Sequence, residues 1–311
     1  MKRKIWIGAS LCLAMLALPA CGRAKMPEDA GSQTDSESGV EDVESHDTKP
    51  DAEAADRDGE ETKEVTEDGS EEGKTGMSVS ILGDSISTYE GWIPEGNSVY
   101  FPHNGAVQDV SQTWWKIVMD ELGLSLCANS SSSGSACYGD STAEDVKVGC
   151  SDYRISQLAG SDGEEPDLII VYMGTNDLVE SIEIGDNDGT RPVEEGMVER
   201  FSDAYSLILD KLERRYPAAQ ICCCTLLPAG NWGTESQPFV TFVNGLGLTA
   251  EEYSVQIEKI AQSRGIPVID LYRCGISLDN MAQMTSDGVH LTPDGMRRVA
   301  DQVISSLSVL F

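Results

Sequence analysis

Residues 79–88 read VSILGDSIST, and this stretch decides how the rest of the chain is interpreted. The apolar run Val79–Leu82 has the composition of a strand that is buried on both faces. It breaks into Gly83-Asp84-Ser85, which is either an ordinary tight turn from a strand into a helix or a corner that presents a serine nucleophile. The histidines elsewhere in the chain decide between these two interpretations.

Similar apolar runs recur along the chain and alternate with amphipathic segments. The five expected strands lie at 78–82, 124–128, 168–173, 220–226 and 267–271. The expected helices lie at about 112–122, 151–159, 195–215, 250–263 and 293–309. Repeated strand–helix units predict an α/β fold, a three-layer α/β/α sandwich around a flavodoxin-like parallel sheet of five strands.

The first 21 residues have the pattern of an export signal. Lys2-Arg3-Lys4 precede an apolar run at 5–18, and the segment ends in LPAC at Cys21. It resembles a bacterial lipoprotein signal peptide in which Cys21 becomes lipidated, although an uncleaved N-terminal anchor is the alternative. Both interpretations predict export. The lipoprotein interpretation places the protein on the outer face of the bacterial cell membrane, held there only by its lipid.

Charge divides the remainder of the chain in two. Residues 22–76 carry 19 acidic and 6 basic residues and no aromatic residue, which predicts a disordered acidic tether. Residues 77–311 are expected to form one domain, with 34 acidic and 13 basic residues. Because binding to nucleic acid needs a cationic face, nucleic acid is excluded as a partner. We expect a monomer.

The nine cysteines do not form the pattern of a disulfide scaffold. The run Cys222-Cys223-Cys224 lies in an expected buried strand, where cysteine acts as a small apolar residue. Cys137 and Cys150 are the only pair considered for a disulfide bridge. No C-x-x-C pair or histidine cluster is present, so no metal site is predicted.

Polar residues follow the expected strands at the points where ligands bind in parallel sheets. Gly83-Asp84-Ser85 follow the first strand, and a serine run ending in Gly134 follows the second. Asn176, within the sequence GTND, follows the third strand. The fifth strand leads to the sequence DGVH at 287–290. The carboxyl ends of all these strands share one edge of the sheet.

A serine hydroxyl needs a base within hydrogen-bond reach to act as a nucleophile. Of the three histidines, His46 lies in the expected tether and His103 has no carboxylate close before it. His290 has Asp287 three residues before it, a spacing that lets the carboxylate orient the imidazole. Ser85, His290 and Asp287 therefore form a candidate triad, with Asp84 as a structural cap of the turn.

Residues 77–311 resemble the SGNH hydrolases, also called the GDSL esterase and lipase family, through four short blocks. GDSIS at 83–87 matches the nucleophile block, with Ile86 where the eponymous leucine stands. NSSSSGS at 129–135 resembles the second block, GTND at 174–177 the third, and DGVH at 287–290 the fourth.

The resemblance implies a mechanism and a set of roles. Ser85 would attack an ester carbonyl with His290 as base and Asp287 as its orienting group. The oxyanion would be bound by the backbone N–H groups of Ser85 and Gly134 and by the side chain of Asn176. Water would then release the acyl group, with no metal or organic cofactor.

The substrate is the least determined part of the prediction. Trp92 and Trp232 lie in segments expected near the carboxyl edge, where they either contact a sugar or pack under a loop. Family and export context favour removal of acetyl or another short acyl group from a small-molecule or polysaccharide ester. Two alternatives stay open: a surface lipoprotein that binds glycans or solutes without catalysis, and an acyltransferase with the same triad.

Overall fold

The computed structural model describes residues 76–310. The signal peptide predicted at 1–21, and the tether predicted at 22–76 except for Gly76, therefore lie outside the described residues. Within 76–310, none of the helices combines the length and the apolar character that crossing a bilayer requires.

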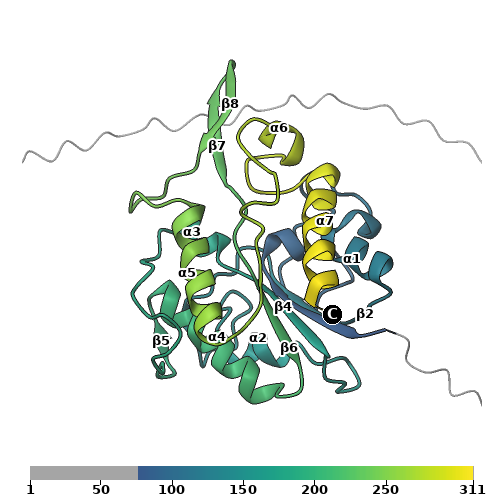
Figure 1. The fold of residues 1–311 in the computed structure, drawn as a ribbon, viewed down its shortest axis with the longest axis vertical. Helices are drawn as coiled ribbons and strands as arrows, with labels where there is room; N and C mark the ends of the chain where they lie inside the picture. Colours follow the sequence, from purple (N-terminus) through teal and green to yellow (C-terminus); the bar gives the residue numbers. More distant parts are fainter. Residues whose placement is uncertain (1–75, 311) are drawn as a thin grey trace, which may run out of the picture. The chain divides into compact units, whose positions relative to one another are not determined.

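A parallel sheet of five strands forms the centre of the domain (Figure 1). The strands lie in the order β2, β1, β4, β6, β9, with bounds Ser125–Ser131, Ser78–Gly83, Leu168–Tyr172, Gln220–Cys224 and Val268–Ile269. The order along the sheet reverses between β1 and β4, which is the flavodoxin-like arrangement. This confirms the predicted fold class and places the switch point, where such folds bind ligands, next to the end of β1.

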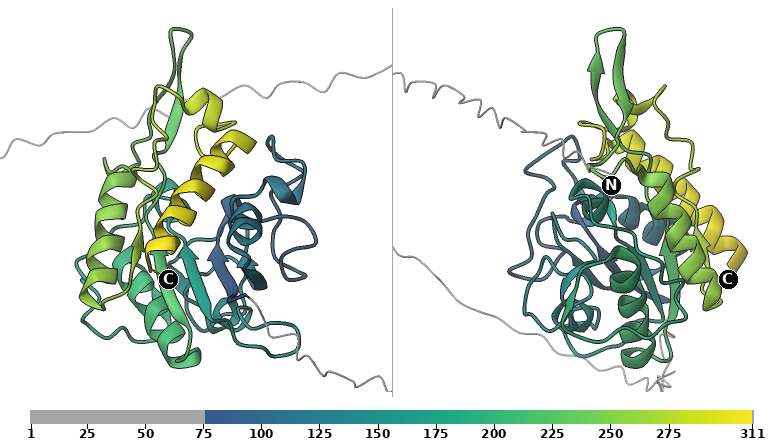
Figure 2. Two further views of the ribbon diagram at one scale, coloured as in Figure 1. Left: turned by 45° about the vertical axis from the view of Figure 1, so that its right-hand side comes forward. Right: turned by 90° about the vertical axis from the view of Figure 1, so that its left-hand side faces the viewer.

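Helices cover both faces of the sheet and enclose two hydrophobic cores (Figures 1 and 2). Alternate residues along β1 serve each core, because Ile81 packs on one side and Leu82 on the other. The first core lies under α1 (Trp114–Leu122) and α7 (Pro293–Leu310), and the second under α2 (Asp152–Ser156), α4 (Phe201–Arg215) and α5 (Ala250–Ser263). Near-continuous apolar composition along the strands is the consequence of this double burial.

The helix expected at 195–215 begins later than predicted. Its first residues contain β5 (Met197–Val198), which pairs antiparallel with β3 (Gly139–Asp140), so α4 begins at Phe201. Two short helices near the carboxyl edge, α3 (Thr175–Val179) and α6 (Met281–Met284), were not predicted. Helices of four or five residues make little more than one turn and show only a weak period in the sequence. The five-residue α2 was expected, but as a longer helix at 151–159.

A hairpin that was not predicted from the sequence stands out from the body of the domain (Figures 1 and 2). It consists of β7 (Gly230–Thr234) and β8 (Gln237–Thr241), which pair antiparallel with each other. The sequence gives a weak signal for it, because the connection is Glu235-Ser236 rather than a glycine turn and Pro238 lies within β8.

The only disulfide considered from the sequence is not formed. Cys137 and Cys150 are both free thiols and are fully buried, as are Cys222, Cys223 and Cys224. The N–H of Cys150 donates to the carbonyl of Cys137 at 3.1 Å, so the two chain segments are held together by their backbones. The thiols serve as small apolar side chains in the core.

Candidate active site

The corner that follows β1 positions Ser85. The turn Ser85–Ser87 is a single 3-10 turn, and the Asp84 carboxylate caps it by accepting the N–H of Ile86 at 3.0 Å. Asp84 therefore has the predicted structural role. A Cβ on Gly83 would lie 2.6 Å from the Ser131 hydroxyl, so only glycine permits this close approach of β1 and β2. Ser85 itself is 6 % exposed.

The structure brings His290 and Asp287 to this corner from the far end of the sequence. Nε2 of His290 lies 2.9 Å from the Ser85 hydroxyl, and Nδ1 lies 2.7 Å from Oδ2 of Asp287. An ionised carboxylate only accepts hydrogen bonds, so Nδ1 carries the proton and Nε2 accepts from the serine. Serine, imidazole and carboxylate thus form a continuous hydrogen-bonded chain.

The charge on Asp287 is stabilised locally. Burial alone would raise the pKa of Asp287, but the hydrogen bond from the His290 ring and those from the backbone of His290 and Val289 outweigh it. These contacts lower the pKa of Asp287 to about 2. The backbone bonds measure 2.8 Å from His290 and 3.0 Å from Val289, both to Oδ1. Asp287 is therefore ionised at any pH where the imidazole can act as a base.

The base of the hairpin holds the turn that contains Asp287 and His290. The N–H of Gly230, the first residue of β7, donates to the carbonyl of Gly288 at 2.9 Å. A Cβ on Gly288 would lie 2.2 Å from the Gly230 carbonyl oxygen, and Gly288 has φ +91°. Glycine is thus required at 288 both by its positive φ and by the close approach of the Gly230 backbone. The hairpin and the Asp287–His290 turn are therefore joined by a backbone hydrogen bond and a close backbone contact.

The three groups predicted to bind an oxyanion lie on neighbouring segments. Gly134 belongs to the loop after β2, and the Ser135 hydroxyl of that loop donates to the Gly83 carbonyl, beside the nucleophile corner, at 3.3 Å. Asn176 lies in the first turn of α3, and its Nδ2 donates to the Ser135 carbonyl at 2.8 Å. Among the described residues, the backbone N–H groups of Ser85 and Gly134 have no hydrogen-bond partner. Both are available to a ligand.

Two further side chains hold this loop. The buried Asp177 carboxylate accepts the N–H of Cys137 at 2.8 Å, and burial raises the pKa of Asp177 to about 6. The ammonium of Lys147 donates to the carbonyl of Ser133, the oxygen end of the amide whose N–H belongs to Gly134. A cationic donor on that oxygen polarises the amide and strengthens the Gly134 N–H as a donor.

A buried arginine supports the sheet edge behind the site. Arg154 is fully buried, and its guanidinium donates to the carbonyls of Gly83 at 2.9 Å and Val146 at 2.6 Å, as well as to that of Ser130. Burial lowers the pKa of Arg154 to about 10, a value at which it remains charged at neutral pH. It satisfies the carbonyls at the ends of β1 and β2, where the parallel ladder stops.

Tyr100 is a site residue that was not predicted from the sequence. Its ring stacks on the His290 imidazole with centroids 3.7 Å apart and planes 8° apart. Tyr100 lies in the same connection as Trp92, and nothing in the sequence of that connection indicates which of its aromatic rings meets the histidine. The rejected His103 instead pairs with Glu90 at 3.1 Å on the surface.

The two tryptophans predicted as substrate contacts are both exposed. Trp92 is 40 % exposed and lies against the buried Trp115, with ring centroids 5.6 Å apart. Trp232 is 69 % exposed and stacks on Phe239 across the hairpin at 4.8 Å. Phe239 is buried, and a Cβ on Gly288 would lie 3.1 Å from its ring. The exposed Trp232 therefore stacks on a ring that itself lies close to the Asp287–His290 turn.

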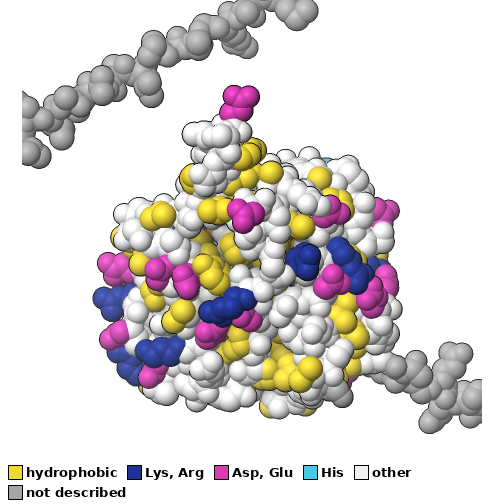
Figure 3. Space-filling model, turned by 45° about the horizontal axis from the view of Figure 1, so that its top comes forward, with side chains coloured by type: hydrophobic (Ala, Val, Ile, Leu, Met, Phe, Trp, Pro, Cys, Tyr) yellow, Lys and Arg dark blue, Asp and Glu magenta, His cyan; other side chains and the backbone are white. Residues whose placement is uncertain are grey.

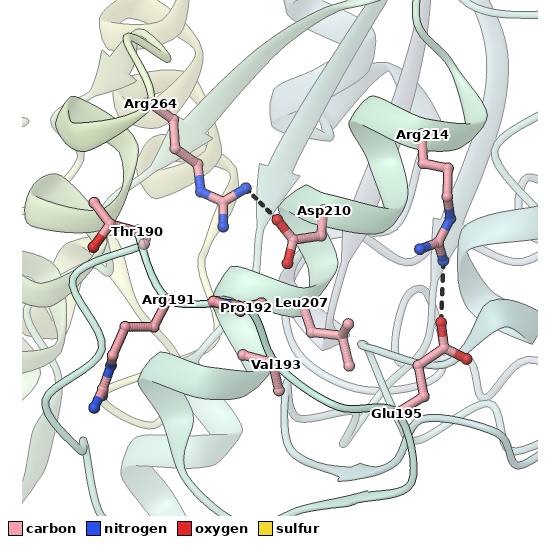
Figure 4. Close-up of a pocket in the computed structure, with 10 residues that line it drawn as sticks. Thr190, Arg191, Pro192, Val193, Glu195, Leu207, Asp210, Arg214 and Arg264 are labelled. Carbon is pink, nitrogen blue, oxygen red and sulfur yellow. Dashed lines mark hydrogen bonds and ion pairs between the residues drawn. The ribbon is translucent and has the colours of Figure 1, made fainter.

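Neither of two cavities in the domain is lined by Ser85, His290 or Asp287. One of about 430 Å³ adjoins Gly134 and is also lined by Tyr138, Lys147, Glu180 and Met197, among others. Another, of about 460 Å³, is lined by residues of the 189–195 segment, α4 and Arg264, and it contains none of the predicted site residues (Figure 4).

In that second cavity Arg264 points to Asp210 at 2.6 Å and Arg214 to Glu195 at 3.1 Å (Figure 4). Arg191 pairs with Asp186, so all three arginines that line the cavity are already paired. Within residues 76–310, no group of three His, Cys, Asp or Glu side chains is placed to hold a metal ion.

Comparison with known proteins agrees with this geometry. Residues 77–227 match the model of the GDSL-like lipase/acylhydrolase family. A candidate GDSL-like lipase from Bacteroides uniformis is 26 % identical, with a TM-score of 0.57, over 76 % of this chain and 97 % of that one. No curated protein sequence is similar to this chain.

Two more distant structures share the fold. A candidate GDSL-like lipase from Bacteroides ovatus is 24 % identical with a TM-score of 0.54, covering 76 % of this chain and 100 % of that one. A carbohydrate acetylesterase from Sinorhizobium meliloti is 19 % identical with a TM-score of 0.51 and the same coverage. The match over residues 77–227 identifies the domain as one of the GDSL-like lipases and acylhydrolases, the SGNH hydrolases, and the protein as a serine hydrolase that acts on ester bonds.

Proposed function

We propose that this protein is an exported esterase that removes short acyl groups, acetyl above all, from carbohydrate by means of a Ser85–His290–Asp287 triad. The observation that carries the proposal is the continuous contact of the three side chains, 2.9 Å from Ser85 to His290 and 2.7 Å from His290 to Asp287. Residues joined in this order suit transfer of a proton from the hydroxyl to the imidazole.

The proposed reaction has two halves. Ser85 Oγ attacks the ester carbonyl while its proton passes to Nε2 of His290, and Asp287 stabilises the resulting imidazolium. The carbonyl oxygen becomes an oxyanion, bound by the N–H groups of Ser85 and Gly134 and by Nδ2 of Asn176. When the tetrahedral intermediate collapses, the imidazolium gives its proton to the departing sugar oxygen.

The acyl group then remains on Ser85 until water removes it. His290 takes a proton from water, whose oxygen attacks the acyl carbonyl, and the same N–H groups bind the second oxyanion. Collapse returns the proton to Ser85 Oγ and releases the carboxylic acid. Bonds to acyl carbon are formed and broken in equal number, and no electron donor or acceptor is needed.

The β7–β8 hairpin supports the proposal that the ester substrate is a carbohydrate. The domain is strongly acidic, yet residues 230–241 carry one charge, Glu235 in the connecting turn. Figure 3 shows an acidic side chain at the tip of the projection and hydrophobic side chains near its base. An exposed indole on a nearly uncharged surface suits the apolar face of a neutral sugar. One structural neighbour is itself a carbohydrate acetylesterase.

Replacing Trp232 by alanine should separate polymeric from small substrates. We expect kcat/KM on an acetylated polysaccharide to fall about 10-fold, because the variant loses one aromatic contact of about 1–2 kcal/mol. Hydrolysis of p-nitrophenyl acetate should change by less than about 2-fold. Val240→Ala, at the other exposed apolar side chain of the hairpin, is the matched control. Equal losses on both substrates would argue against sugar binding by the hairpin.

The proposed function itself is tested by acetate release from acetylated xylan, mannan and chitin oligomers, measured for the wild type and for Ser85→Ala. We expect release from at least one carbohydrate that depends on Ser85. Acyl transfer to added acceptor sugars without release of free acetate would instead identify an acyltransferase. Binding of glycans without turnover of any ester would contradict the proposal.

The proposed location rests on residues 1–21, outside the described part of the chain. We propose lipid attachment at Cys21 and residence on the outer face of the membrane. Cys21→Ser should abolish incorporation of a clickable fatty acid in the native host and move the protein from the membrane fraction to the medium or periplasm. Unchanged labelling of the Cys21→Ser variant would contradict the anchor.

A further inference from the structure

The ring of Tyr100 lies flat against the proposed base. Its plane lies 8° from that of the His290 imidazole, with the centroids 3.7 Å apart. Parallel rings at this distance share van der Waals contact over one whole face of the imidazole. That face is therefore closed to water, and the imidazole cannot rotate about its Cβ–Cγ bond without separating the stack.

The backbone of Tyr100 is tied to the nucleophile corner. Its N–H donates to the Thr88 hydroxyl at 3.0 Å, and that hydroxyl donates to the carbonyl of Ser85 at 3.0 Å. The chain of bonds from Tyr100 through Thr88 to Ser85 sets the position of the aromatic ring relative to the serine. One residue thus contacts the base with its side chain and the nucleophile's turn with its backbone.

The charge of Asp287, the third member of the proposed triad, acts on the Tyr100 hydroxyl. Burial, together with this negative charge, raises the pKa of Tyr100 to about 12. Tyr100 consequently stays protonated at neutral pH. The contact that Tyr100 makes with the proposed triad is therefore the stack of its ring on His290.

We propose that Tyr100 is a positioning residue of the catalytic base, whose π face holds the His290 imidazole in the line from Ser85 to Asp287 and stabilises the imidazolium formed during proton transfer. The inference rests on the proposed function of His290. Imidazole gains a positive charge as Ser85 attacks, and an aromatic face attracts a cation more strongly than a neutral ring. The stack is thus stronger in the transition state than in the ground state, and the difference raises kcat.

Three variants separate the ring from the hydroxyl and from the loop. Tyr100→Leu removes the π face, Tyr100→Phe keeps it without the hydroxyl, and Tyr89→Leu alters a tyrosine of the same segment whose hydroxyl bonds only to the Gln108 carbonyl. On p-nitrophenyl acetate, Tyr100→Leu should lower kcat about 10-fold, equivalent to about 1.4 kcal/mol, with KM within about 2-fold. Tyr100→Phe and Tyr89→Leu should retain kcat within about 3-fold.

The pH profile supplies a second readout that mere packing would not change. Activity requires a neutral imidazole, and the stack favours the protonated one, so removal of the ring should move the acid limb of kcat/KM to lower pH. The carboxylates that act on His290 are Asp287, which contacts it, and the buried Asp84, and neither changes in these variants. Tyr100→Phe should keep the acid limb of the wild type.

The outcomes distinguish this inference from the proposed function. A wild type without esterase activity, or one whose activity survives Ser85→Ala, removes the proposed function and this inference with it. An active, Ser85-dependent wild type combined with an unchanged kcat and acid limb in Tyr100→Leu overturns the inference alone. Equal losses in Tyr100→Phe and Tyr100→Leu also overturn it, because the hydroxyl rather than the ring would then matter.

Discussion

Replacement of Ser85 by alanine should lower kcat by a factor on the order of 10⁶, the largest effect expected of any single substitution in this chain. The variant has no nucleophile, and His290 retains no hydroxyl proton to accept. Residual activity above the rate in water would come from the oxyanion donors and from substrate binding. The measurement is the initial rate on p-nitrophenyl acetate with highly purified protein, because trace wild type would dominate.

Ser87→Ala is the matched control for this substitution. Ser87 lies on the same turn and its hydroxyl accepts the indole N–H of Trp114 at 3.1 Å, away from the proposed triad. We expect Ser87→Ala to unfold at a lower temperature, because a buried donor loses its partner, and to retain kcat within about 3-fold. A Ser85→Ala variant no slower than Ser87→Ala would exclude Ser85 as the nucleophile.

Replacement of Asp287 by asparagine should lower kcat by about 10⁴-fold, as the same change does in the serine protease that defines this type of triad. The asparagine amide can donate to Nδ1, which moves the imidazole proton to Nε2. A protonated Nε2 faces Ser85 as a donor and cannot accept the hydroxyl proton. The variant should still bind substrate, so the loss should appear in kcat rather than in KM.

The pH dependence of Asp287 follows from its environment. Its pKa in the folded protein, about 2, lies below the ordinary aspartate value, so the folded state binds fewer protons there than the unfolded state. The carboxylate therefore stabilises the fold above the ordinary pKa, and this contribution is lost as pH falls toward 2. Activity lost in mildly acidic buffer should therefore not come from Asp287.

Asp279→Asn, at an exposed carboxylate before α6, controls for the change in net charge. It should leave both kcat and the acid limb of the profile unaltered. If Asp287→Asn retained more than about a tenth of wild-type kcat, the carboxylate would not be orienting the base.

The fold and the proximity of the proposed catalytic residues could be predicted from sequence for one physical reason. Strands buried on both faces are continuous in apolar residues, so β1, β4 and β6 are visible without any alignment. Once the sheet is parallel, the residue after each strand must lie at one edge. Ser85 and Asn176 were placed there by topology alone.

The remaining features depend on contacts between distant segments, which no local pattern encodes. Tyr100 lies in a long connection without periodicity, and its stacking on His290 exists only once that connection folds over the sheet edge. The β7–β8 hairpin has neither a glycine turn nor alternating apolar residues, and β5 has two residues. Because β5 pairs with β3, α4 begins later than the sequence predicts.

The most direct test of the central claim is to trap the covalent intermediate. Wild-type protein mixed with p-nitrophenyl acetate and quenched in acid within milliseconds should carry one acetyl group, and peptide mapping should place it on Ser85. His290→Ala should show no adduct on that timescale. Rapid turnover with no acetylated serine, or acetylation at another residue that turns over at the steady-state rate, would contradict the mechanism.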